Sequence, residues 1–360
     1  MKKYKLYIVF LISCISLITF LQYIPFNKTS SFSDLSAALI NSEVNSVNGN
    51  YDSIKTNSSS SSCFDQADHK VQFIEVEKDV KLEVLDWGGK GEYLVFLTGL
   101  GDNAHVFDNF AYQFTDLYHV IGITRRGFGN SDKPATGYSE ERRVQDYLNV
   151  LDSLGIQSAL FAGHSIAGGE LSQLGIYHKD RVKKLVYIDA SPDFGQHKYL
   201  DQPPSVDYSE EDLMSIERFI AATTRKFGYR EPNSAVCNGY IIGNTGEIVD
   251  FRSPPEVSSQ IIQSAEDKDF TKIDIPVLAL FDEFTLDYRF PFYWYLDDKK
   301  QEEYLQAWKP LVKWQQDLIN RFRTDVKNIN IIMLKNAYHY IFINKESDVA
   351  REMRRFLMQQ

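Results

Sequence analysis

The segment 158–168, SALFAGHSIAG, constrains the fold more than any other part of the chain. A short apolar run ends at Gly163, Ser165 follows two positions later, and small residues then lead into a predicted helix. This is the layout of a nucleophile elbow, G-x-S-x-G with Ala167 at the last position, in which a tight strand-to-helix turn presents a serine hydroxyl above a sheet. We expect Gly163 to let the backbone turn without a side-chain clash, and the small Gly168 to let the helix start press against the strands. The segment therefore predicts a strand, a turn and a helix around one candidate nucleophile, Ser165.

Composition and charge limit the classes of protein to consider. The chain has 360 residues and a net charge of -10, so it can bury one large core or two ordinary ones. An acidic balance argues against a surface for nucleic acid or for anionic lipid, because both reward clustered Lys and Arg. Three cysteines, Cys14, Cys63 and Cys237, are too few for a disulfide scaffold and lack the spacing of a metal site. A Cys63–Cys237 disulfide is the minor alternative and requires a location outside the cytoplasm.

The first 26 residues have the pattern of an export signal or membrane anchor. Three lysines among the first five residues precede an uncharged, mostly apolar run over 6–24. The run is also long enough to span a bilayer as a helix. Cys14 lies in a sequence similar to a bacterial lipobox, but apolar residues continue after it, so we favour an anchor over lipidation. We expect 1–26 to be a signal peptide or anchor, and the protein to be exported and membrane-anchored, periplasmic or extracellular.

A linker is predicted between this segment and the folded part of the chain. Residues 27–68 are rich in Ser and Asn, including five consecutive serines at 58–62. Such a composition is typical of a flexible spacer.

Strands alternate with helices along the rest of the chain. The segments 71–76 and 81–85 predict the two strands of a hairpin, and short apolar runs predict strands at 93–97, 120–124, 158–162, 185–188, 276–281 and 329–334. Helices are predicted at 104–117, after an N-cap at Ser139, from the elbow to about 179, and at 210–226, 302–322 and 349–357. This alternation predicts a mostly parallel sheet covered by helices on both faces.

Over about 70–360 the chain resembles the α/β-hydrolase fold family. Besides the elbow, the turn TGLG at 98–101 stands where the family has its oxyanion loop, and RGFGNSD at 126–132 matches the turn after the next strand. The resemblance implies an eight-stranded, mostly parallel sheet flanked by helices, with a helical cap inserted over the active site. It divides the chain into a first core part (69–190), a cap (191–271) and a second core part (272–360).

The resemblance also implies the oxyanion donors. These are the backbone N–H groups of Leu100 in the loop and Ile166 after the nucleophile. The residues usual at the starts of the two turn motifs, histidine and aspartate, are replaced by Thr98 and Thr124. Because the donors are backbone groups, these departures need not alter the chemistry.

A serine hydroxyl needs a base, and His339 is the candidate. It follows the predicted strand 329–334 and precedes the last helix, which is the family's place for the catalytic histidine. His164, beside the nucleophile, is expected to point away from the serine and to support the structure. Four other histidines lack such a context and are interpreted as surface or local polar groups: His105, His119, His178 and His197.

The acid that orients the histidine is less well defined. In most of the family it follows the next-to-last strand, but the matching position here holds Thr285. Asp189, at the end of the strand 185–188, occupies the place that a minority of the family uses. We favour Asp189 and keep three alternatives near the usual position: Asp282, Glu283 and Asp287.

These residues predict a serine hydrolase that cleaves an ester or related carboxylic-acid derivative through an acyl-enzyme. The partner is a small-molecule acyl substrate, and the chemistry requires no metal or organic cofactor. Aromatic residues at 290–295 either form an apolar wall for the substrate or pack the cap onto the core. The alternative is a catalytically inactive binding protein on the same scaffold, tethered to the cell envelope, which the unusual Thr98, Thr124, Ala167 and Thr285 motivate.

Overall fold

The computed structural model describes residues 63, 67–204 and 207–359. The predicted signal or anchor segment 1–26 and nearly all of the predicted linker 27–68 lie outside the described residues. Among the described residues, no helix is both long and apolar enough to cross a membrane.

The core is one eight-stranded sheet, as predicted, with the strand order β1-β2-β4-β3-β5-β6-β9-β10. Its strands are β1 (Lys70–Glu77), β2 (Val80–Gly88), β3 (Tyr93–Leu97), β4 (His119–Ile123), β5 (Ala159–His164), β6 (Val182–Ile188), β9 (Val277–Asp282) and β10 (Ile329–Leu334). β1 and β2 form an antiparallel hairpin, β2 pairs antiparallel with β4, and the remaining neighbours are parallel. The carboxyl ends of the parallel strands therefore meet at one edge, where open α/β sheets bind their ligands.

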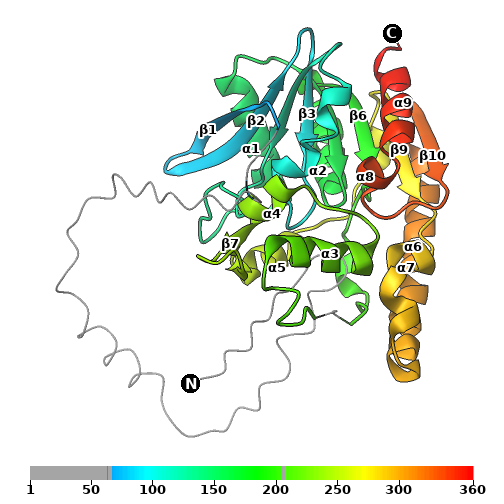
Figure 1. Cartoon of the computed structure of the whole chain (residues 1–360). Helices are drawn as coiled ribbons and strands as arrows, with labels where there is room; N and C mark the ends of the chain where they lie inside the picture. Colours follow the sequence, from blue (N-terminus) through cyan, green and yellow to red (C-terminus); the bar gives the residue numbers. More distant parts are fainter. Residues whose placement is uncertain (1–62, 64–66, 205–206, 360) are drawn as a thin grey trace, which may run out of the picture.

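Helices cover both faces of the sheet (Figure 1). The core helices are α1 (Glu140–Ser153), α2 (Ala167–Tyr177), α6 (Leu286–Arg289), α7 (Asp298–Asp325), α8 (Ile341–Asn344) and α9 (Glu346–Leu357), with the short turns η3 (Ala104–Phe107), η4 (Ala111–Gln113), η5 (Lys179–Arg181), η7 (Phe270–Lys272) and η8 (Pro291–Tyr295). Successive side chains of β3 alternate between two apolar clusters, as the pleat of a strand dictates. Leu94 and Phe96 pack with η3, η4 and α9, whereas Val95 and Leu97 pack with α1, α2 and the end of α7.

The predicted helix at 104–117 is wrong, because the segment forms the separate turns η3 and η4. Asn103 caps η3 by accepting a hydrogen bond from the His105 N–H. Asp108, which follows η3, accepts hydrogen bonds from Trp87 Nε1 (3.1 Å) and Ser234 Oγ (2.6 Å). These tertiary contacts hold the segment against β2 and the insertion, and they override its helix propensity.

The insertion between β6 and β9 lies as one group at one end of the sheet (Figure 1). It contains η6 (His197–Tyr199), α3 (Ile216–Phe227), α4 (Asn233–Gly239), β7 (Tyr240–Ile242), β8 (Ile248–Phe251) and α5 (Pro255–Gln263). α3 begins later than the predicted 210–226 helix because Ser215 caps it, its Oγ accepting from the Arg218 N–H. The two-stranded β7–β8 sheet was not predicted, since neither strand exceeds four residues.

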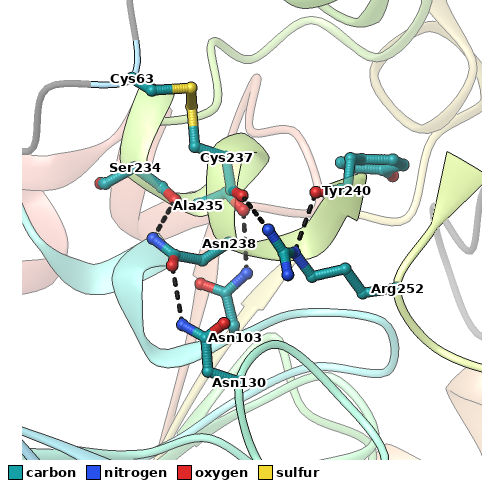
Figure 2. Close-up of a disulfide and its surroundings, with 9 residues drawn as sticks. All are labelled: Cys63, Asn103, Asn130, Ser234, Ala235, Cys237, Asn238, Tyr240 and Arg252. Atoms are coloured by element: carbon teal, nitrogen blue, oxygen red, sulfur yellow. Dashed lines mark hydrogen bonds between the residues drawn. A yellow bond between two sulfur atoms is a disulfide. The ribbon is translucent and has the colours of Figure 1, made fainter. Parts of the chain in front are cut away.

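A disulfide between Cys63 and Cys237 ties the chain ahead of β1 to α4. Figure 2 shows the surrounding contacts, in which Asn103 Nδ2 donates to the Ala235 carbonyl (2.9 Å) and Asn130 Nδ2 to Asn238 Oδ1 (2.8 Å). The insertion is thus fastened to the loops that follow β3 and β4. The sequence-based preference for unpaired cysteines is wrong: the fold brings together two residues that lie 174 positions apart.

Removal of this disulfide is expected to destabilise the protein. A cross-link that closes so long a loop restricts the unfolded chain, and its loss costs about 2–5 kcal/mol of unfolding free energy. We expect the Cys63→Ser/Cys237→Ser double variant to unfold at a lower temperature than the oxidised wild type. A reductant should lower the midpoint temperature of wild-type unfolding to that of the variant, and it should leave the midpoint of the variant unchanged. A wild-type midpoint that is insensitive to reduction would contradict this prediction.

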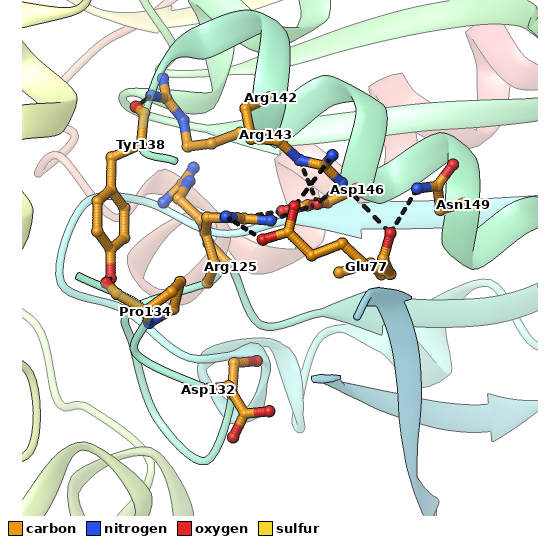
Figure 3. A network of polar contacts seen from close by, with 12 residues as sticks. Glu77, Arg125, Asp132, Pro134, Tyr138, Arg142, Arg143, Asp146 and Asn149 are labelled. Carbon is orange, nitrogen blue, oxygen red and sulfur yellow. Dashed lines mark hydrogen bonds and ion pairs between the residues drawn. The ribbon is translucent and has the colours of Figure 1, made fainter. Parts of the chain in front are cut away.

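Buried ion pairs hold the turn after β4. Arg126 pairs with Asp146 of α1 through two hydrogen bonds of 2.5 and 2.7 Å. Arg142, one turn before Asp146 on the same helix, binds that carboxylate and also approaches Glu77 of β1 (Figure 3). This network has a structural role, because it fixes the 126–132 turn against α1 rather than contributing to the serine site.

Candidate active site

Ser165 lies in the sharp turn between β5 and α2. Its φ is +58°, a left-handed conformation that is uncommon for a residue with a side chain and is concentrated at functional sites. Gly168 is required by a close approach, since a Cβ there would lie 2.0 Å from the Ser191 carbonyl oxygen. The expectation that Gly163 makes the turn needs correction. Its φ is not positive, and what it provides is space, because a Cβ there would lie 2.9 Å from that of Ala167.

The fold brings the three predicted catalytic side chains into contact. His339 Nε2 lies 2.9 Å from Ser165 Oγ, and His339 Nδ1 lies 2.5 Å from Asp189 Oδ2. Each follows a different parallel strand, β5, β10 or β6, so all three reach the carboxyl edge of the sheet. The residues are 4–6% exposed. In this geometry the histidine can accept the serine proton while the carboxylate fixes the imidazole tautomer.

The alternative acids do not contact the histidine within the described structure. Glu283 and Asp287 are exposed, and Asp287 accepts a hydrogen bond from Trp294 Nε1 (2.8 Å). Asp282 is buried, but its carboxylate accepts from Arg289 (3.1 Å) and from the Phe284 N–H (2.9 Å). Asp189 is therefore the only one of the four carboxylates that the structure places against His339.

Arg289 sets the electrostatics behind this acid. Its Nη1 donates to Asp189 (2.8 Å) and to Asp282 (3.1 Å). Burial raises the pKa of Asp189, but the charge of Arg289 and the His339 contact outweigh it and hold that pKa well below its usual value. Burial and the neighbouring Asp189 charge raise the pKa of Asp282 to about 7. The arginine thus stabilises one ionised carboxylate beside the histidine.

The same surroundings disfavour a charged histidine in the free protein. Burial, the Arg289 charge and the neighbouring His164 lower the pKa of His339 to about 3, although Asp189 acts in the opposite direction. The resting imidazole is therefore neutral and able to accept a proton over a wide pH range.

The pH dependence of activity follows from this pKa. If His339 is the base, kcat/KM should remain nearly constant from pH 7 to pH 5 and fall only as the pH approaches the lowered pKa. With a histidine of ordinary pKa, kcat/KM would instead fall about 25-fold over that interval. Initial rates in buffers of constant ionic strength measure this. A fall of kcat/KM with a midpoint near pH 6.5, in a protein that remains folded, would contradict the lowered pKa of His339.

The two predicted oxyanion donors belong to the loop after β3, which carries Leu100, and to the residue directly after Ser165, which is Ile166. Ile166 is the N-cap residue of α2, and neither its N–H nor that of Leu100 has a hydrogen-bond partner among the described residues. The loop that carries Leu100 is held by buried Arg125, whose guanidinium donates to the Thr98 and Gly99 carbonyls (2.7 and 2.8 Å).

Arg125 also links this loop to the elbow helix. It forms a bidentate pair with Glu170 of α2, at 2.9 Å for both contacts. Burial raises the pKa of Glu170, but Arg125 and Arg143 outweigh it and lower that pKa to about 2. The pair therefore stays ionised and fixes the oxyanion loop relative to the turn at Ser165.

His164 has the supporting place expected of it. Its Nε2 lies 3.2 Å from the carbonyl oxygen of His339, and its Nδ1 lies 3.5 Å from Asp102 Oδ2. Tyr340 Oη donates to Asp102 Oδ1 (2.9 Å). The elbow, the histidine loop and the oxyanion loop are thus connected behind the reacting groups.

The cavity at Ser165 is small, with a volume of about 10 Å³. That is roughly the space one water molecule needs, so an ester does not fit the cavity in this conformation. It is lined by Ser165, Asp189, Ser191, Phe194, His197, Phe284, Arg289, Trp314, Gln315 and His339. Trp314 also forms part of a more open groove of about 430 Å³ between α7 and the residues on either side of η6.

Several cavity residues were missed from the sequence. His197 was interpreted as a surface or local group, yet it is buried in the cavity wall. Trp314 and Gln315 belong to α7, whose pattern predicted a helix but not which face meets the site. The aromatic segment 290–295 does not line this cavity. Phe290 and Phe292 pack on Tyr304 of α7. Of the two interpretations of this segment, the structure thus agrees with packing rather than with a wall for the substrate.

One group of described side chains could hold a metal ion, and it is separate from the serine site. The ligand atoms of His69, His105 and Asp108 lie within 4.8 Å of one another. Asp108 also accepts the hydrogen bonds from Trp87 and Ser234 described above. Because Ser234 belongs to α4, these contacts link the insertion to the core.

Comparison with known proteins identifies the fold. A family model described as alpha/beta hydrolase fold matches residues 92–219. The chain is 30% identical over 104 residues to 2-(acetamidomethylene)succinate hydrolase of Mesorhizobium japonicum, covering 29% of this chain and 37% of that protein. It is 34% identical over 110 residues to a non-heme chloroperoxidase of Streptomyces lividans, covering 30% of this chain and 40% of that protein. The matched segments thus span less than half the length of these curated relatives.

Solved structures extend the likeness beyond the matched segment. The crystal structure of E-2-(acetamidomethylene)succinate hydrolase superposes with a TM-score of 0.59 at 17% identity, covering 81% of this chain and all of that one. At such low identity the superposition establishes the arrangement of strands and helices, and not the substrate.

Proposed function

Because the chain belongs to the α/β-hydrolase fold family, we propose that it is a serine hydrolase that cleaves an ester or a related carboxylic-acid derivative. The continuous contact from Ser165 through His339 to Asp189 carries this proposal. A serine hydroxyl that donates to a buried neutral imidazole, which in turn donates to a carboxylate, is the arrangement that activates serine for attack on a carbonyl.

The mechanism follows from these positions. Ser165 Oγ attacks the carbonyl carbon as His339 Nε2 takes its proton, and the Leu100 and Ile166 N–H groups stabilise the developing oxyanion. Each such donor contributes about 10²–10³-fold to the rate. The imidazolium then protonates the leaving group, which leaves an acyl-Ser165. A water molecule, deprotonated by His339, hydrolyses this acyl-enzyme and releases the acid.

The acyl-enzyme is tested by partitioning. Esters that share one acyl group and differ in their leaving alcohol should pass through the same acyl-Ser165. With methanol added to the buffer, the ratio of methyl ester to acid should therefore be the same for every leaving group. Ratios that vary with the leaving group would exclude a common acyl-enzyme. The His339→Ala variant measures the background reaction.

We also propose that the protein works outside the cytoplasm, tethered by its N-terminal segment. The lysine-led apolar run over 6–24 and the Cys63–Cys237 disulfide support this location, because disulfides persist in oxidising compartments. Fractionation of the source cells, followed by alkylation of free thiols, tests it. Recovery of the protein in the cytoplasm with both cysteines reduced would contradict it.

A further inference from the structure

His197 is a buried side chain in the cavity wall that the proposed mechanism does not use. It lies in η6, is 2% exposed, and lines the same cavity as Ser165 and His339. Neither of its ring nitrogens has a hydrogen-bond partner among the described residues. A buried polar group without a partner weakens the folded state, so each instance in a native protein requires an explanation.

The two residues that flank His197 are anchored through their side chains, which helps to fix the buried position of the ring between them. Gln196 Nε2 donates to Asp267 Oδ2 (2.5 Å), and Lys198 Nζ donates to the Ala265 carbonyl (2.8 Å). Both partners lie in the segment between α5 and η7. With its two neighbours bound outside, the residue between them points into the cavity.

Two aromatic rings hold the imidazole in place. The centroid of His197 lies 4.9 Å from that of Trp314 and 5.5 Å from that of Phe194, at interplanar angles of 59° and 78°. These contacts fix the plane of the imidazole beside the cavity, and both of its nitrogens stay without a hydrogen-bond partner among the described residues. A residue kept only for packing would not need two nitrogen atoms here.

The imidazole is uncharged at physiological pH. Burial, together with the positive charge of Arg289, lowers the pKa of His197 to about 3. A neutral imidazole offers one N–H donor and one nitrogen acceptor. It does not act as the counter-ion of an anionic group. The positive charge nearby, on Arg289, is already paired with Asp189 and Asp282.

We propose that His197 is a substrate-binding residue whose ring N–H donates a hydrogen bond to an uncharged oxygen that the substrate carries close to its scissile carbonyl. This inference rests on the proposed serine hydrolase function and narrows its substrate class. The preferred esters carry an ether, hydroxyl or carbonyl oxygen on the acyl or the alcohol side, whereas plain hydrocarbon chains leave His197 unpaired.

The test uses pairs of esters that differ by one oxygen in place of one methylene. On the acyl side the pair is p-nitrophenyl methoxyacetate and p-nitrophenyl butyrate, and on the alcohol side it is 2-methoxyethyl acetate and butyl acetate. The ratio of kcat/KM within each pair is divided by the ratio of the rate constants for hydroxide-catalysed hydrolysis of the same two esters. This division removes the difference in their intrinsic reactivity. We expect the wild type to prefer the oxygen-bearing ester of at least one pair by about 10-fold or more.

Two variants assign this preference to His197. His197→Phe keeps an aromatic ring against Trp314 and Phe194 but removes both nitrogens, so it should lose the preference. His197→Gln retains a donor and should keep most of it. Because His197→Phe also removes two unpaired buried polar atoms, its melting temperature should equal or exceed that of the wild type.

Each contrary result has a distinct meaning. The His197 proposal is overturned if the wild type shows no preference, or if His197→Phe keeps the wild-type preference. It is also overturned if His197→Phe has a lower melting temperature and loses activity equally on all four esters, because that result indicates a structural role. Labelling of Ser165 by diisopropyl fluorophosphate is measured in parallel. If Ser165 is labelled while the preference is absent, only the His197 proposal fails. If the folded wild type is neither labelled nor active, the serine hydrolase proposal fails.

Discussion

The Ser165→Ala variant is expected to lose ester hydrolysis by on the order of 10⁶-fold in kcat, because the nucleophile and its proton are removed together. The fold should persist. Alanine can adopt the left-handed conformation at this turn about as well as serine, and the loss of one hydrogen bond to His339 changes the free energy of unfolding by about 1 kcal/mol. Initial rates and thermal unfolding of both proteins measure the two effects.

Ser172→Ala is the matched control for this variant. Ser172 is a buried serine of α2, and its hydroxyl donates to the Pro192 carbonyl (2.6 Å). It is not among the residues that line the cavity. It should retain activity of the same order as the wild type. If Ser165→Ala is as active as Ser172→Ala and the wild type, Ser165 is excluded as the nucleophile. If both variants lose activity equally, the loss is a general effect of altering this part of the fold.

The Asp189→Asn variant should reduce kcat by on the order of 10⁴-fold. An amide at this position can offer its N–H to His339 Nδ1 and so stabilise the wrong tautomer, and it cannot balance the imidazolium that forms. The loss should fall mainly on kcat, because the carboxylate contacts the base rather than the substrate. Steady-state kinetics on a p-nitrophenyl ester separates kcat from KM.

Asp282→Asn is its matched control. Both carboxylates bind Arg289, but Asp282 has a pKa of about 7 and contacts His339 nowhere in the described structure. An amide resembles the protonated acid, so we expect a loss of less than about 10-fold, in line with one weakened hydrogen bond. The reverse order of effects, with the larger loss at Asp282, would transfer the orienting role to the strand β9.

The sequence allowed the sheet and the elbow to be predicted, because both depend on local patterns. A predicted hairpin and six short apolar runs, separated by turn residues, gave the positions of all eight strands of the central sheet. The spacing around Ser165 and the position of His339 after the last strand likewise depend on the order of residues along the chain. The structure brings these two side chains within hydrogen-bonding distance.

The features that escaped prediction depend on tertiary contacts. The segment 104–117 has apolar spacing that suits a helix, but Asp108 is drawn to Trp87 and Ser234, which lie far away in the sequence. The acid had four candidates because strand ends at β6 and β9 both carry aspartate, and only packing decides which one meets His339. His197 lies in an insertion without clear periodicity, where nothing local indicates that a polar residue is buried.

Covalent labelling tests most directly whether Ser165 is an activated nucleophile. The folded protein is treated with diisopropyl fluorophosphate, chosen because the cavity is small, and the modified peptide is identified by mass spectrometry beside Ser165→Ala. We expect one diisopropylphosphoryl group on the peptide that carries Ser165, and no modification of the variant. Absence of labelling on the folded wild type, or a label on another residue, would contradict an activated serine at this position.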